Sequence, residues 1–246
     1  MIDLRLGDCL EVMKTIEDGS IDAIITDPPY GTTACKWDSV IDFDLMWEQL
    51  NRIIKPNGAI VLFGSEPFSS ALRMSNIKNY KYDWVWNKTK GGGFALANKM
   101  PLKRHEIISV FYKKLPTYNP QKTKAAEHLI DKRKTINNSK SSSIVSPIQK
   151  GAIRKKDDGT RFPTTSLNFS SVSMGKHPTQ KPIELMEYLI KTYTNENETV
   201  LDFTMGSGST GVAAKNLNRN FIGIEMDDNY FEIARKRIEE TEYKLF

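Results

Sequence analysis

Short apolar runs that alternate with amphipathic segments are the feature that most constrains the fold of this chain. The runs IDLRL, IDAIIT and AIVLFG in the first part, and TVLDF and NFIGIE in the last part, have the length and composition of buried strands. The segments CLEVMKTI, DFDLMWEQLNRII, PIELMEYLIKTY and DNYFEIARKRIEE place apolar side chains at helical spacing. Strands that alternate with helices predict an α/β fold with a doubly wound, mostly parallel sheet.

The regular pattern is interrupted once, which divides the chain into three zones. Residues 1–114 and 176–246 carry the strand and helix patterns, whereas residues 115–175 are rich in Lys, Ser, Asn and Thr. From Lys113 to Arg161 the chain has 13 Lys and Arg against 4 Asp and Glu, and the remainder has a net charge of −4. The middle zone is therefore either a module that binds a polyanion or a solvated, poorly ordered loop.

Composition narrows the classes of protein. Hydrophobic residues make up 39% and charged residues 26%, as in ordinary globular proteins, and no apolar run has the roughly 18–20 residues of a membrane helix. The amino terminus lacks the apolar core of a signal peptide. Cys9 and Cys35 provide no disulfide framework, so a reduced, cytoplasmic setting is expected. The three histidines and two cysteines lack zinc-ligand spacing, so we expect no metal site.

The segment VLDFTMGSGSTG predicts a cofactor site. A buried strand leads through a glycine loop into a helix, where the backbone turns sharply and approaches a ligand closely. Glu225 follows about 20 residues later, at the end of the next strand, where an acid accepts the two ribose hydroxyls of an adenosine cofactor. A purely structural turn and a nicotinamide dinucleotide site are alternatives. The Asp202–Phe203 pair before the loop suits the uncharged thioether nucleoside of S-adenosylmethionine better.

The strand IDAIIT ends at Asp27, Pro28, Pro29 and Tyr30, which predicts a second part of the site. The prolines fix φ, so the carboxylate, the carbonyls and the ring are held in a rigid loop at the carboxyl edge of the sheet. Asp27 and the Pro28 carbonyl accept hydrogen bonds from an exocyclic amino group and disperse the positive charge that develops on its nitrogen. Tyr30 offers a face for an extruded base. The loop therefore predicts methylation of a base amino group.

The segments DPPYGTT, HPTQKP, LDFTMGSGSTG and GIEMDDNYFEIARKRI together resemble the amino-group DNA methyltransferases, which modify adenine N6 or cytosine N4. Their order along the chain resembles the beta group of that family. The resemblance implies a Rossmann-like, circularly permuted fold with a mostly parallel seven-stranded sheet. Residues 1–114 would form the catalytic half, 115–175 an inserted target-recognition region and 176–246 the cofactor-binding half.

The resemblance also assigns roles to residues. Asp8 would contact the adenine of the cofactor, although it is equally placed to cap the following helix. Lys181 and His177 would close over the cofactor, unless His177 only orders its loop. The implied S-adenosylmethionine site comprises Asp8, Cys9, His177, Lys181, Asp202, Phe203, Gly206, Gly208, Ser209, Thr210 and Glu225. Phosphate contacts would come from Lys132, Arg133, Lys134, Arg154, Lys155, Lys156 and Arg161.

The predicted activity is direct methyl transfer from S-adenosylmethionine to adenine N6 in double-stranded DNA, without a covalent intermediate. Adenine is favoured because family members that act on cytosine more often have Ser in place of Asp27. N4-cytosine methylation, an RNA or protein amino methyltransferase and an inactive DNA-binding module are the alternatives. A cognate restriction endonuclease and a homodimer are expected as partners. The three glycines of KTKGGGF predict a flexible loop that moves over the substrate.

Overall fold

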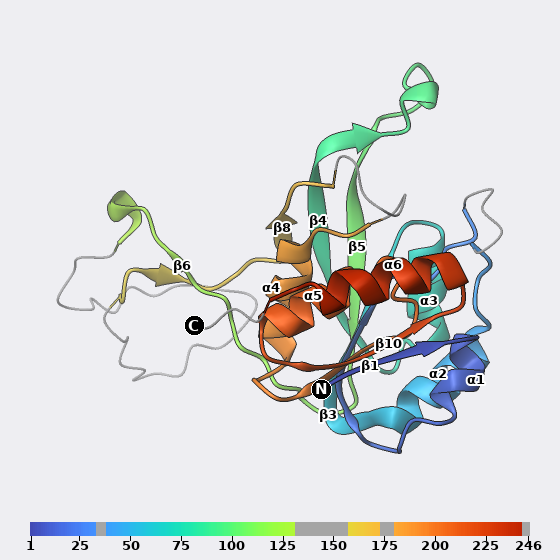
Figure 1. Cartoon of the computed structure of the whole chain (residues 1–246). Coiled ribbons are helices and arrows are strands. Elements are labelled where there is room, and N and C mark those ends of the chain that lie inside the picture. The colour runs from blue at the N-terminus through green and yellow to red at the C-terminus, as the bar shows by residue number, and fades with distance from the viewer. Residues whose placement is uncertain (33–37, 131–156, 173–179, 243–246) are drawn as a thin grey trace. The chain divides into compact units, whose positions relative to one another are not determined.

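The computed structural model of the chain describes residues 1–32, 38–130, 157–172 and 180–242 (Figure 1). The chain divides into two compact units, which are Met1–Asn119 with Thr164–Phe246, and Pro120–Pro163. The second unit lies inside the zone 115–175 that the sequence sets apart as an insertion. None of the helices in the described ranges is long and apolar enough to cross a membrane.

The strands and helices of the first unit follow the alternation expected from the sequence. Its strands are β1 (Ile2–Leu6), β2 (Ile21–Thr26), β3 (Ile54–Gly64), β4 (Tyr80–Gly92), β5 (Lys103–Phe111), β8 (Ser166–Asn168), β9 (Thr199–Asp202) and β10 (Asn220–Glu225). Its helices are α1 (Cys9–Met13), α2 (Phe43–Ile53), α3 (Phe68–Ser75), α4 (Ile183–Tyr193), α5 (Ser209–Asn216) and α6 (Asp228–Glu239), with a 3₁₀ turn η1 (Phe94–Leu96). The second unit contains a two-stranded ribbon of β6 (Thr123–Lys124) and β7 (Thr160–Arg161), and a 3₁₀ turn η2 (Glu127–Leu129).

The sheet of the first unit has eight strands in the order β1-β10-β9-β2-β3-β5-β4-β8. Each pairing is parallel except those that β5 makes with β3 and β4. The predicted mostly parallel sheet is thus confirmed, and it gains an eighth strand because β8, which follows the second unit in the chain, pairs with β4 at Val85–Ser166 and Trp86–Leu167. Sequence patterning missed β8 because it has three residues and one buried side chain.

Helices cover both faces of the sheet, as expected for a doubly wound fold. Alternate residues of β3 point to opposite faces, so that Val61 and Phe63 pack with α4, α5 and α6, whereas Ile60 and Leu62 pack with α1, α2 and α3. The strands of the sheet centre are therefore apolar on both faces, and the stretches Ala23–Thr26 and Gly58–Gly64 are buried. This arrangement leaves the carboxyl ends of the parallel strands as the place where polar side chains gather.

The circular permutation determines which strands meet at the centre. β9 lies directly beside β2, with Ala23 opposite Val200 and Ile24 opposite Leu201. From this pair the chain runs outward in both directions, through β10 on one side and β3 on the other. Open α/β sheets bind ligands at the carboxyl ends of strands where the strand order reverses in this way.

Candidate active site

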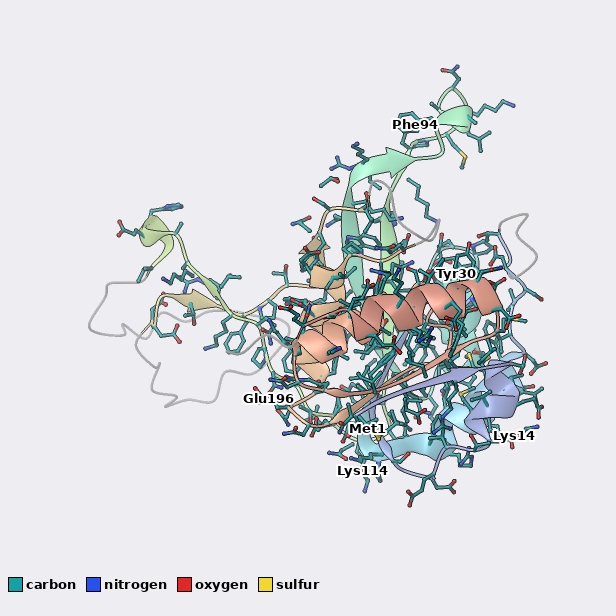
Figure 2. All side chains as sticks on the ribbon, viewed as in Figure 1. Met1, Lys14, Tyr30, Phe94, Lys114 and Glu196 are labelled. Atoms are coloured by element: carbon teal, nitrogen blue, oxygen red, sulfur yellow. The ribbon has the colours of Figure 1, made fainter. Side chains whose placement is uncertain are left out.

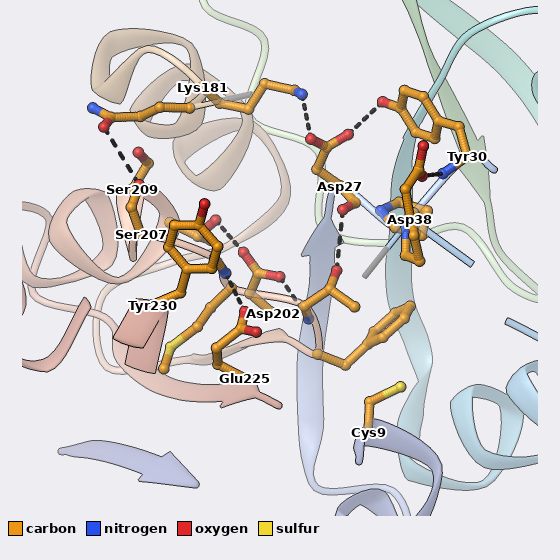
Figure 3. Close-up of a pocket in the computed structure, with 18 of the residues that line it drawn as sticks. Cys9, Asp27, Tyr30, Asp38, Lys181, Asp202, Ser207, Ser209, Glu225 and Tyr230 are labelled. Carbon is orange, nitrogen blue, oxygen red and sulfur yellow. Dashed lines mark hydrogen bonds and ion pairs between the residues drawn. The ribbon is translucent and has the colours of Figure 1, made fainter. Parts of the chain in front are cut away.

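A cavity of about 500 Å³ lies at the carboxyl ends of β1, β2, β9 and β10 (Figure 3). This volume is in the range of small-molecule sites. The cavity brings together predicted residues from both ends of the chain. Those that line it are Asp8, Cys9, Asp27, Pro28, Pro29, Tyr30, Lys181, Asp202, Phe203, Gly206, Ser209, Thr210 and Glu225.

The loop after β2 is held by a carboxylate that sequence reasoning missed. Asp38 Oδ1 accepts hydrogen bonds from the backbone N–H groups of Tyr30 and Gly31, both at 2.8 Å, and its Oδ2 accepts from the N–H of Thr32 at 2.9 Å. Asp38 is nearly buried. Because the two prolines fix the start of the loop and Asp38 fixes its end, the loop conformation is preorganised.

Asp27 occupies the centre of a charged network (Figure 3). Its Oδ1 accepts a hydrogen bond from the Tyr30 hydroxyl, and its Oδ2 pairs with the Lys181 ammonium. Lys181 Nζ is also 3.4 Å from Glu106 Oε2, and Glu106 Oε1 pairs with Lys88. The two carboxylates and two ammonium groups therefore form one alternating chain of charges along the cavity wall.

Burial and the neighbouring charges shift the pKa values in this network. Burial raises the pKa of Asp27, and the Glu106 carboxylate adds to this rise while Lys181 opposes it. Burial alone would lower the pKa of Lys181, but Asp27 and Glu106 raise it on balance, so the amine stays protonated. Burial would raise the pKa of Glu106, but Lys181 and Lys88 lower it. Burial, with Asp27 next to it, also raises the pKa of the Tyr30 phenol, which remains a hydrogen-bond donor.

Asp202 joins the two halves of the site. Its Oδ2 accepts from the Thr210 hydroxyl at 2.5 Å, and its Oδ1 accepts from the Thr26 hydroxyl and from the Thr204 N–H. Burial raises the pKa of Asp202 to about 6, against the lowering effect of these donors. Since both carboxylate oxygens are engaged inside the protein, Asp202 ties the end of β9 to β2 and to the first turn of α5.

Two further acids lie at the strand ends on the other side of the cavity. Glu225 Oε2 accepts from the Gly206 N–H at 2.8 Å, and its Oε1 accepts from the backbone N–H groups of Met226 and Asp227, both at 3.0 Å. Asp8 Oδ1 caps α1 by accepting from Leu10 N–H and Glu11 N–H. The capping interpretation of Asp8 is thus confirmed, and Asp8 lines the cavity as well.

The two glycines that end the loop serve close packing. Gly208 has φ +80°, and a Cβ there would lie 2.9 Å from the Cβ of Ala234 in α6. A Cβ on Gly211 would lie 2.3 Å from Ile238 Cδ1 and 2.7 Å from Phe221 Cε1. Gly208 is not among the residues that line the cavity. The glycine lets α5 and α6 approach closely, and its predicted role in cofactor binding stays a prediction.

The Cys9 thiol in the cavity is poorly suited to nucleophilic catalysis. Cys9 is buried, and burial, followed by the charge of Asp8, raises the pKa of its thiol to about 12. A thiol that stays protonated at neutral pH is a poor nucleophile. Within the described ranges, no three His, Cys, Asp or Glu side chains are grouped so as to hold a metal ion. The second cysteine of the chain, Cys35, lies outside the described ranges.

Most of the predicted basic residues, and His177, lie outside the ranges that the structure describes. His177 and six of the basic residues, Lys132, Arg133, Lys134, Arg154, Lys155 and Lys156, lie outside the described residues. Arg161 is described, and its guanidinium forms hydrogen bonds of 2.9 and 3.0 Å with the carboxylate of Asp157 in the second unit.

Sequence reasoning missed Glu106, Lys88 and Trp86, as well as Asp38. Each of the first three is on one of the antiparallel strands β4 and β5, and lines the cavity. The available signal was Glu106 itself, because a carboxylate directly before the apolar run IISVF is out of place unless it has a partner. Phe63 and Trp84 are core residues, and the Phe63 ring lies 5.2 Å from Lys181 Nζ.

Comparison with known proteins identifies the family. A family model described as DNA methylase matches residues 21–236, which is most of the chain. The chain belongs to this family. The family predicted from the sequence is thereby confirmed.

Relatives agree with this assignment along nearly the whole chain. The type II methyltransferase M.HinfI of Haemophilus influenzae is 31% identical over 95% of this chain and 67% of its own length. M.HpaI of Haemophilus parainfluenzae is 29% identical over 97% of this chain and 75% of its own length. The crystal structure of an M1.HpyAVI–SAM complex matches with a TM-score of 0.63 and 29% identity, covering 96% of this chain and all of that one.

A more distant structure supports the fold alone. The cytosine-N4-specific PvuII DNA methyltransferase matches with a TM-score of 0.69 at 17% identity, over 99% of this chain and 88% of that chain. The permuted α/β fold is therefore shared among proteins whose sequences have diverged widely.

Proposed function

We propose that this protein methylates the exocyclic amino nitrogen of adenine, N6, in duplex DNA, with S-adenosylmethionine as the methyl donor. The observation that carries the proposal is the position of Asp27. Its carboxylate lies on a rigid Pro-Pro loop at the wall of a 500 Å³ cavity that the glycine loop also lines. Membership of the DNA methylase family supports the same reading.

The cavity residues fit S-adenosylmethionine. Glu225 and Asp8 supply acceptors at adjacent strand ends, suited to ribose hydroxyls and an adenine amino group, and Phe203 supplies an apolar wall. The Ser209 Oγ atom is buried without a hydrogen-bond partner among the described residues, as expected of a group that a ligand satisfies. S-adenosylmethionine supplies an electrophilic methyl group on a positively charged sulfur.

The amino nitrogen of an extruded base is a weak nucleophile because its lone pair is delocalised into the ring. Two acceptors, the Asp27 carboxylate and the Pro28 carbonyl, draw it toward tetrahedral geometry and disperse its developing positive charge. Asp27 is paired with Lys181 and Tyr30. For the base to bond Asp27, Lys181 has to turn away, and Glu106, 3.4 Å from its Nζ, is the carboxylate that receives it.

Asp27 also favours adenine over cytosine, since the amino methyltransferases that act on cytosine more often have Ser at the corresponding position. M.HpaI and M.HinfI are named as type II methyltransferases, which supports duplex DNA as the substrate. A cognate restriction endonuclease and a homodimer remain predictions.

The experiment that tests this function identifies the methylated nucleoside. The purified protein is incubated with methyl-labelled S-adenosylmethionine and unmethylated duplex DNA, and the DNA is digested to nucleosides. We expect labelled N6-methyladenine. Labelled N4-methylcytosine would support methylation of an amino group but would refute adenine as the target base. Unlabelled DNA with retained cofactor binding would refute the whole proposal.

Asp27→Ala separates chemistry from binding in the same assay. We expect transfer to fall by about 100-fold or more, because the group that stabilises the developing charge is lost. Cofactor affinity, measured by calorimetry, should change little, since Asp8, Phe203 and Glu225, which are proposed to hold the cofactor, are unchanged. Retained activity in a folded variant would contradict the role of Asp27.

A further inference from the structure

The strands β4 and β5 continue beyond the body of the sheet as a hairpin, residues 88–105, with Phe94 near its tip (Figures 1 and 2). The sequence predicted a flexible loop at KTKGGGF, but Gly91 and Gly92 belong to β4, and Gly92 pairs with Lys103. A Cβ on Gly91 would lie 2.9 Å from the Cβ of Leu102, so the glycine lets the two strands approach. The segment is therefore an ordered projection.

The tip of the hairpin exposes large apolar side chains to solvent. The exposed fractions are 70% for Phe94, 45% for Leu96, 56% for Met100 and 37% for Leu102. The turn itself is ordered by backbone hydrogen bonds from Leu96 N–H to Gly93 O at 2.9 Å and from Met100 N–H to Leu96 O at 3.0 Å. A group of apolar side chains at the end of an ordered projection indicates a binding surface.

The flanks of the hairpin are basic. Five cations lie within residues 88–105, and the chain has no Asp or Glu between Asp83 and Glu106. The cations are Lys88, Lys90, Lys99, Lys103 and Arg104. Lys88 pairs with Glu106 at the base of the hairpin, and the other four cations lie farther along it. The combination of an apolar tip with positive flanks matches nucleic acid, which offers stacked bases between two rows of phosphates. A second copy of the hairpin is disfavoured as occupant, because a symmetric contact would place the same cations against one another.

The base of the hairpin is part of the active-site wall. Lys88 and Glu106, the first residue of the hairpin and the residue that follows it, both line the cavity. From Lys88 to Gly92 the strand β4 rises roughly 13 Å at about 3.3 Å per residue, which exceeds the depth of either groove of DNA. A duplex whose base enters the cavity therefore lies within reach of the tip.

We propose that the hairpin 88–105 is a DNA-docking wedge. Phe94 and its apolar neighbours insert into the base stack beside the target, and Lys90, Lys99, Lys103 and Arg104 contact the flanking phosphates. The inference rests on the proposed function, because extrusion of the target base leaves a gap in the duplex and costs stacking energy. Insertion of an apolar side chain offsets that cost.

The test compares paired and mispaired target bases, using the recognition sequence obtained by sequencing the methylated DNA. Phe94→Ala should lower kcat/KM on the paired duplex by about tenfold or more, and should reduce the fluorescence rise of a base analogue at the target position. A mispaired target base is already loosened. On a duplex with such a base, kcat/KM of the same variant should lie within about threefold of that of the parent chain. Cofactor binding should be unchanged, which also shows that the variant is folded.

A matched control and a charge variant complete the design. Met74→Ser removes a methionine of α3 that is 68% exposed, and should leave both substrates unaffected. Lys90→Gln combined with Lys99→Gln should reduce the slope of log affinity against log salt by about 2, since each phosphate contact contributes ~0.9.

The proposal is overturned if Phe94→Ala acts like the parent on the paired duplex, or if it loses activity equally on both substrates. It is also overturned if the variant only changes the oligomeric state in sedimentation, which would point to a second copy on the tip. Activity of the parent on the mispaired duplex tests the proposed function separately. A parent that labels no adenine in the nucleoside assay refutes the function before the duplexes are made, whereas an active parent with an unaffected variant refutes only the wedge.

Discussion

At the scale of single residues, the site is a balance of buried charges. Lys181 is 7% exposed and stands between two carboxylates, Asp27 and Glu106. Breaking a buried ion pair is costly unless the released ion finds another partner. Glu106 provides that partner, because its buried Oε2 atom already lies 3.4 Å from Lys181 Nζ. We therefore expect the availability of Asp27 for a base to depend on Glu106.

Glu106→Gln tests this dependence. A neutral side chain at this position leaves Lys181 with Asp27 as its anionic partner, so that vacating Asp27 costs more. We expect kcat to fall about tenfold, which corresponds to ~1.4 kcal/mol, with the affinity for S-adenosylmethionine unchanged. Single-turnover rates and calorimetry measure the two quantities.

The control for this variant is Glu48→Gln, which makes the same change on the exposed face of α2. It should leave kcat unaltered. If Glu106→Gln weakened cofactor binding and left the single-turnover rate intact, Glu106 would support the cofactor side of the cavity instead.

At the scale of elements, the glycine loop depends on how closely α5 and α6 approach. Gly208 combines a left-handed φ of +80° with a position that Ala234 leaves no room to enlarge. Gly19 has a similar φ of +61°, but a Cβ there would meet nothing within 4 Å. Substitutions at Gly208 and Gly19 can therefore separate the cost of backbone strain from the cost of disturbed packing between α5 and α6.

We expect Gly208→Ala to lower the free energy of unfolding by about 2–5 kcal/mol, because a strained φ costs ~1–2 kcal/mol and overpacking adds ~1–3. Gly19→Ala should cost only the strain, about 1–2 kcal/mol. Urea denaturation of both variants provides the comparison. Equal losses in the two variants would show that packing between α5 and α6 contributes nothing at this position.

At the scale of the whole molecule, the cavity and the excess of basic residues belong to different units of the chain. Every residue that lines the cavity belongs to the first unit, Met1–Asn119 with Thr164–Phe246. The second unit, Pro120–Pro163, carries 11 Lys and Arg against 4 Asp and Glu. We infer that cofactor binding resides in the first unit and that the second contributes mainly to DNA affinity.

Replacing residues 120–163 with a flexible linker of about ten residues tests this division. The affinity for S-adenosylmethionine should stay within about threefold, because no cavity residue is removed, whereas duplex affinity at 0.1 M salt should fall by at least about tenfold. Calorimetry and fluorescence anisotropy measure these. Loss of cofactor binding in a folded protein would show that the second unit supports the cavity.

The sequence alone predicted the two loops of the site and the type of sheet, because the patterns that encode them lie in neighbouring residues. A strand followed by two prolines, or by a glycine loop and a helix, is encoded in neighbouring residues, so the loop at Asp27 and the loop at Gly206 were both predicted. The doubly wound sheet followed from the alternation of strands and helices. The order of these motifs along the chain also matched the permuted family.

The tertiary structure decided what those local signals meet. Lys181 pairs with Asp27 across 154 residues of sequence, and Glu106 reaches the same point from an antiparallel hairpin. Neither contact has a local signature, because it depends on which strands lie side by side and in what register. The eighth strand and the projecting hairpin are decided in the same way, since pairing between distant segments is a property of the assembled sheet.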